Sequence, residues 1–101
     1  MVIVQGIFEV LPEERSVFLD ARLAVIRASR EEDGCQEYVL APDPIEPGRV
    51  IISERWESMG HLQRHLDRLS GQSSEPSREA LPQPLNVHIT LYEVAASKRL
   101  R

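Results

Sequence analysis

Residues 49–56 read RVIISERW, and the fold can be inferred outward from this short segment. It is rich in β-branched residues and follows residues 42–48, three of which are proline, so it has the pattern of a strand that begins after a loop. Because side chains alternate along a strand, two faces can be assigned. One face carries Val50, Ile52, Glu54 and Trp56, and the other carries Ile51, Ser53 and Arg55. Both faces therefore carry isoleucine.

Three further segments have strand character: residues 2–10, 35–41 and 85–94. In residues 2–10 apolar side chains occupy both sets of alternate positions, which is typical of an inner strand. The last segment alternates most clearly. We expect its inward row to be Leu85, Val87, Ile89 and Leu91 and its outward row to be Asn86, His88, Thr90 and Tyr92.

Two helices are expected between these strands. The first runs from Pro12 to about Arg30 and ends at Asp33-Gly34, since proline suits a first helical turn and Asp-Gly favours a chain reversal. Its apolar residues recur at helical spacing: Val17, Phe18, Ala21, Val25 and Ala28. The second helix covers residues 59–69 behind Ser58 as N-cap. Its apolar stripe is Met59, Leu62, Leu66 and Leu69.

The order β-α-β-β-α-β predicts a ferredoxin-like α+β fold with a four-stranded antiparallel sheet and both helices on one face. Residues 1–101 form a single domain, with a core over 2–94 and a tail over 95–101. The helix-free face still carries apolar residues such as Ile3, Ile7 and Ile51, so we expect it to be buried in a homodimer. The long polar connection over 70–84, with one helical turn near 76–80, is expected to act as a lid.

Composition excludes several classes of partner. The net charge is −4 and basic residues form no stripe, which argues against nucleic acid. Lys98, Arg99 and Arg101 make only a short basic tail, and no apolar run is long enough to span a membrane, so no membrane partner is expected. The single cysteine, Cys35, fits a reducing compartment, and the start of the chain does not resemble a signal peptide. We expect a cytoplasmic protein.

Two motifs carry a resemblance to a known family. Residues 32–38, EDGCQEY, are similar to the E-x-G-C-x-x-Y stretch that opens the second strand of antibiotic biosynthesis monooxygenase domains. Residues 54–66 are similar to the E-x-W-x-[ST]-x-x-x-L-x-x-H-L signature at their third strand and second helix. The resemblance covers about residues 2–94. Residues 67–71, DRLSG, depart from the histidine- and aromatic-containing segment that many family members have there.

The resemblance implies a dimeric α+β barrel with a pocket between sheet and helices. It also implies a monooxygenase that needs no metal and no other cofactor and oxidises a quinol or other electron-rich aromatic small molecule with O2. The alternatives are a non-catalytic dimeric α+β barrel that binds a small apolar ligand, and a haem-binding or haem-degrading protein. Haem is disfavoured because Gln5 and Gly6 stand where haem-degrading relatives use an asparagine.

His65 is the candidate catalytic residue, because a neutral histidine on the border of an apolar helix stripe can take a phenolic proton. Its structural alternative is a pair with Glu54 or with the backbone. The candidate substrate-binding residues are Trp56, Tyr38, Glu54 and Phe8.

Metal binding and thiol chemistry are both disfavoured. His61 and His65 are spaced to share a helix face, yet no third ligand of suitable spacing is evident, so no metal is expected. Cys35 has no evident activating base and is expected to pack.

Overall fold

The computed structural model describes residues 1–72 and 83–101. Its elements follow in the order β1 (Val2–Glu9), a 3-10 helix (Pro12–Glu14), α1 (Arg15–Asp20), α2 (Leu23–Arg30), β2 (Cys35–Pro42), β3 (Arg49–Trp56), α3 (Met59–Gln72) and β4 (Asn86–Glu93). The predicted ferredoxin-like α+β fold is confirmed. The predicted helical turn near residues 76–80 and most of the predicted lid lie outside the described residues.

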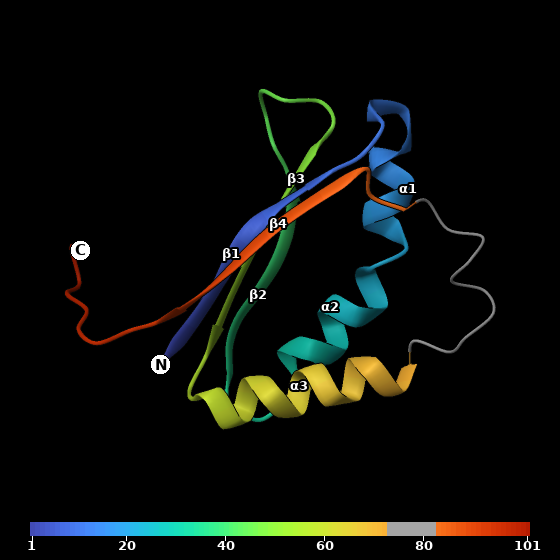
Figure 1. The fold of residues 1–101 in the computed structure, drawn as a ribbon. Coiled ribbons are helices and arrows are strands. Elements are labelled where there is room, and N and C mark those ends of the chain that lie inside the picture. The colour runs from blue at the N-terminus through green and yellow to red at the C-terminus, as the bar shows by residue number, and fades with distance from the viewer. Residues whose placement is uncertain (73–82) are drawn as a thin grey trace.

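The sheet has four strands in the order β2-β3-β1-β4, and all neighbouring strands are antiparallel. The predicted inner position of β1 is confirmed. Figure 1 shows α1, α2 and α3 gathered on one side of the sheet, and no other described element covers the opposite face. In the register of β1 with β3, Val4 faces Glu54 and Ile7 faces Ile51, so the two predicted faces of residues 49–56 are also confirmed.

The helix side of the sheet holds two groups of buried apolar side chains. The first group lies toward α3: Val2, Val4, Ile26, Tyr38, Trp56 and Leu62. The second group lies toward α1: Val10, Phe18 and Val50, with Phe8 packed against them. The candidate site described below belongs to the first group.

The first predicted helix is broken at residues 21–22, where the side chain of Arg22 contacts Phe18, four residues before it. The Arg22 guanidinium lies 3.5 Å from the centroid of the Phe18 ring and its Nη1 donates to the Phe18 carbonyl oxygen at 3.1 Å. The backbone N–H of Arg22 instead bonds to the carbonyl of Leu19. The Phe18 carbonyl is thus bonded by the Arg22 side chain in place of the Arg22 backbone N–H, and a turn separates α1 from α2.

The predicted apolar stripes are partly wrong, because the break and the packing rotate the helices. Val17 is 50% exposed and Ala28 is also exposed, while Ile26 and Ser29 are buried. On α3, Leu62 and His65 face the sheet, whereas Met59 and Leu66 are 41% and 45% exposed.

The apolar row of β4 lies on the helix side, since Leu91 pairs with Val4 and Val87 with Phe8. The side chains of this row remain more than 40% exposed, because α2 packs on β2 and α3 packs on β3, away from the edge of the sheet that β4 forms. Among the described residues, no helix is long and apolar enough to cross a membrane.

Candidate functional site

His65 lies on the inner side of α3 and is only 2% exposed. The Ser58 side chain caps the helix N-terminus as predicted, since its Oγ accepts the backbone N–H of His61 at 3.3 Å. The centroid of the His65 ring lies 4.6 Å from that of Trp56 and 5.3 Å from that of Tyr38. The structure therefore brings together three of the predicted site residues, on α3, β3 and β2.

The imidazole of His65 lies between two carboxylates. Its Nδ1 is 2.6 Å from Oε2 of Glu32, which lies in the turn after α2, and its Nε2 is 3.9 Å from Oε1 of Glu54. The Glu32 contact is a short hydrogen bond, while the Glu54 contact is too long for one. The predicted structural partner, Glu54, is thus the more distant of the two.

Glu54 is a buried carboxylate at 6% exposure. Its Oε1 accepts the indole N–H of Trp56 at 2.9 Å. Burial raises the pKa of Glu54, and the bond from Trp56 and the nearby His65 act against that rise. Neighbours thus compensate part of the cost of burying this carboxylate.

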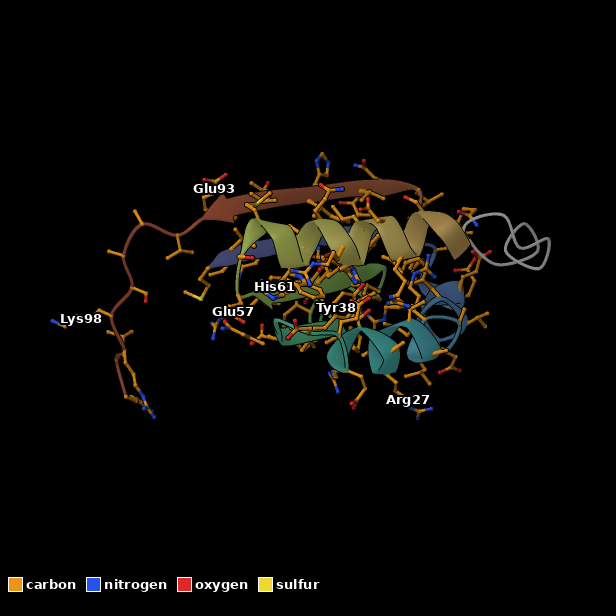
Figure 2. The ribbon with its side chains drawn as sticks, turned by 90° about the horizontal axis from the view of Figure 1, so that it is seen from below. Arg27, Tyr38, Glu57, His61, Glu93 and Lys98 are labelled. Atoms are coloured by element: carbon orange, nitrogen blue, oxygen red, sulfur yellow. The ribbon has the colours of Figure 1, made fainter. Side chains whose placement is uncertain are left out.

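Tyr38 contributes a protonated hydroxyl to the same cluster. Burial, and then the nearby charge of Glu54, raise the pKa of Tyr38 to about 12, against a hydrogen bond with the side chain of Ser29 that lowers it. Tyr38 therefore stays neutral near pH 7 and can donate a hydrogen bond. Figure 2 shows Tyr38 in the layer between α2 and α3.

A hollow of about 230 Å³ reaches the cluster from the surface. It is lined by Glu32, Asp33, His61, Arg64, His65 and Arg68, so it lies between the turn after α2 and α3. A second hollow, of about 340 Å³, lies along β2 beside Arg30 and Tyr38. Within the cluster, His65, Trp56 and Tyr38 pack against one another.

Phe8 and His61 lie apart from this cluster. Phe8 is farther along β1, and its ring centroid is 5.3 Å from that of Phe18 in the second group of buried residues. The Nδ1 of His61 is 2.7 Å from the Ser58 hydroxyl, and its Nε2 is 3.5 Å from Asp33. In residues 1–72 and 83–101, no group of three histidine, cysteine or acidic side chains is placed to hold a metal ion.

Cys35 is half-buried at the start of β2, with Sγ 3.7 Å from the Glu37 carbonyl oxygen. Burial, with further contributions from the charges of Glu32 and Glu54, raises the pKa of its thiol. A raised pKa disfavours the thiolate that nucleophilic chemistry needs, so packing remains the better interpretation of Cys35.

Sequence reasoning missed Ser29, Glu32 and Arg68 as members of the site. Arg68 Nε donates to Glu32 Oε1, and Arg68 Nη2 donates to Ser29 Oγ at 3.3 Å. Arg68 stands three residues after His65 and so faces the same side of α3, which is the signal that could have found it. Glu32 begins the EDGCQEY motif, yet its distance of 33 residues from His65 conceals the contact.

The geometry can be compared with known proteins. A sequence model described as "Antibiotic biosynthesis monooxygenase" matches residues 1–70. The chain belongs to the antibiotic biosynthesis monooxygenase family. The match includes every residue of the cluster around His65, and the resemblance of residues 32–38 and 54–66 to this family is thereby confirmed.

Relatives of this family member cover nearly its whole length. It is 27% identical over 88 residues to "Putative monooxygenase YcnE" of Bacillus subtilis, which covers 86% of this chain and 93% of the relative. A crystal structure from Deinococcus radiodurans, titled as a "putative antibiotic biosynthesis monooxygenase", has a TM-score of 0.83 at 26% identity and covers 100% and 99% of the two chains. The haem-degrader MhuD of Mycobacterium tuberculosis has a TM-score of 0.73 at 14% identity, with 98% and 100% coverage, and shares the fold.

Proposed function

We propose that this family member is a cofactor-independent monooxygenase that oxidises a quinol or other electron-rich aromatic small molecule with O2. One observation carries the proposal. His65 is buried against the rings of Trp56 and Tyr38 and is held by a carboxylate at its Nδ1. A buried histidine with an ordered carboxylate partner is suited to general base catalysis, and aromatic neighbours suit an aromatic substrate.

In the proposed reaction His65 takes the hydroxyl proton of the substrate on Nε2. The imidazolium that forms lies between Glu32 and Glu54, which stabilise its positive charge. The deprotonated ring then donates electrons to O2. One oxygen atom enters the ring in place of a hydrogen, the other leaves as water, and the quinol becomes a hydroxyquinone, so the substrate itself supplies every electron that O2 requires.

Substrate binding is assigned to Trp56, Tyr38 and Glu54. Tyr38 is a neutral donor for a phenolate oxygen, and the Trp56 ring orients the substrate ring. Since these rings pack against His65, a substrate ring that reaches Nε2 must separate them. Phe8 remains a predicted contact only for a ligand long enough to reach along β1.

Oxygen uptake with a panel of quinols and anthrones, without added metal or flavin, tests this function. We expect His65→Gln to lower kcat by about 100-fold or more, in line with loss of a general base. Asp67→Asn is the control, because Asp67 is an exposed residue on α3 two positions after His65, where its side chain accepts a hydrogen bond from Gln63. Circular dichroism confirms that both variants are folded. No uptake by the unchanged protein, or equal uptake by both variants, would refute the proposal.

A non-catalytic dimeric α+β barrel that binds a small apolar ligand is the second candidate. It is favoured by the close packing of His65, Trp56 and Tyr38, and by the departure of residues 67–71 from the family pattern. Quenching of the fluorescence of Trp56, the single tryptophan, by an aromatic ligand without oxygen uptake would favour this candidate.

We also propose that the chain forms a homodimer through the helix-free face of the sheet. Ile3 and Ile7 lie on that face opposite Tyr92 and His88, and the neighbouring Ile51 is 39% exposed. Covering such a face removes apolar surface from water. Sedimentation velocity at micromolar concentration should show a dimer that Ile7→Glu dissociates, while Leu23→Glu, on the exposed side of α2, leaves it intact. A monomeric unchanged protein would contradict the proposal.

A further inference from the structure

A chain of polar side chains ties α2 to α3 beside the candidate base. Ser29, which is fully buried, bonds Arg68, and Arg68 bonds Glu32. Glu32 in turn bonds His65 at 2.6 Å. The side chains of Glu32 and Arg68 are 18% and 29% exposed, so the chain runs from the hollow at the surface to the buried imidazole.

The two oxygens of Glu32 have different partners. Oε1 accepts from Arg68 Nε, and Oε2 meets His65 Nδ1. Because each oxygen has its own donor, the carboxylate cannot rotate without losing a bond. Arg68 is itself held at a second nitrogen by Ser29, so the orientation of Glu32 is set from both sides.

We propose that Glu32 and Arg68 are positioning residues that hold neutral His65 in the tautomer with its proton on Nδ1. An ionised carboxylate can only accept a hydrogen bond, so Nδ1 must donate and Nε2 must carry the lone pair. Nε2 is the nitrogen on the side of Glu54 and Trp56. The chain of polar residues therefore directs the basic nitrogen toward the aromatic side of the cluster.

The effect of this arrangement on catalysis rests on the proposed oxygenase function. The position of the proton on His65 does not depend on that function. A purely structural ion pair between Glu32 and Arg68 would stabilise the fold without fixing the proton of His65. Long-range nitrogen–proton NMR correlations of the imidazole distinguish the two cases, because they identify which ring nitrogen carries hydrogen. The chain has three histidines, so three ring patterns need assignment.

The variants Glu32→Gln and Arg68→Met test the two positioning residues, each against a neighbour. Glu31→Gln removes an exposed charge next to Glu32, and Arg64→Met removes an exposed cation one turn before Arg68. The amide of a glutamine at position 32 can either donate to or accept from Nδ1 of His65, so Glu32→Gln should populate both tautomers of His65. We expect Glu32→Gln to lower kcat about 10- to 100-fold with KM within about twofold, as for other residues that orient a functional histidine.

Arg68→Met should lower kcat in the same direction but less, because Glu32 keeps its bond to His65. If Glu32→Gln does not fold, the double variant Glu32→Gln/Arg68→Gln removes both charges and keeps the test available. The proposal is overturned if unchanged His65 carries its proton on Nε2, or if Glu32→Gln matches Glu31→Gln in tautomer and kcat. A proton on Nδ1 in a protein without oxygen uptake supports the positioning role and refutes only the oxygenase function.

Discussion

Trp56→Phe tests how the buried Glu54 is accommodated beside His65. The substitution keeps an aromatic ring but removes the indole N–H that bonds Glu54 at 2.9 Å. Loss of a hydrogen bond to a buried charged acceptor costs about 1.5–3 kcal/mol. Trp56 is fully buried, so the smaller ring leaves roughly 40 Å³ unfilled, which adds about 1 kcal/mol at ~24 cal/mol per Å³.

The sum is about 3 kcal/mol, which is a large part of the ~5–15 kcal/mol stability of a small domain. Urea unfolding followed by circular dichroism measures it, since Trp56 is the single tryptophan and fluorescence is lost in the variant. Glu54→Gln is the matched control, because the amide oxygen still accepts the indole N–H while the charge is gone. The control should cost less than Trp56→Phe.

The double variant completes a thermodynamic cycle. Residues that share a bond show coupling, and we expect about 1 kcal/mol or more between Trp56 and Glu54. Additive effects, or a cost for Trp56→Phe no larger than the ~1 kcal/mol of lost volume, would refute the view that the indole stabilises this buried carboxylate.

Three further outcomes are expected. The pKa of Glu54 is raised in the folded protein, so its contribution to folding stability is present at low pH and is lost as pH rises above about 4.5. Glu54→Gln should therefore gain stability relative to the unchanged protein between pH 4.5 and pH 8. A stability difference that stays constant over this range would contradict the prediction. Ultraviolet titration should show Tyr38 ionising at about 12, and a Tyr38→Phe difference spectrum that titrates near pH 10 would contradict the burial argument. Gly6→Ala should cost about 1–3 kcal/mol of unfolding free energy, because a Cβ there would lie 2.0 Å from the His88 carbonyl oxygen. Gly71→Ala, in open space on α3, should be neutral or stabilising.

The fold was predictable because its signals are local. Alternation in residues 49–56 assigned Glu54 and Trp56 to one face of β3, and that assignment depends only on the period of a strand. The break at Arg22 was not predicted, because the periodicity of apolar residues carries no signal for a side chain that bonds the carbonyl four residues before it. The exposure of Met59 and Leu66 likewise depends on how α3 lies on the sheet, which helical periodicity does not specify.

The site was predictable in part. His65, Trp56 and Tyr38 could be selected because their motifs flank strands and a helix that the fold brings together. Glu32 was overlooked as a partner of His65, because the strand pattern of residues 49–56 pointed to Glu54, which shares a sheet face with Trp56. Only the position of the turn after α2 against α3 shows that Glu32 is the closer of the two.

Labelling with ¹⁸O2 shows whether the protein inserts an oxygen atom from O2 into its substrate. The unchanged protein, without added metal or flavin, should place one labelled oxygen atom in the quinone product for each O2 consumed. His65→Gln should lose this incorporation, while the control variant Asp67→Asn should keep it. Label that appears only as hydrogen peroxide, or incorporation that is equal in His65→Gln, would contradict the assignment of His65 as the base of a cofactor-independent monooxygenase.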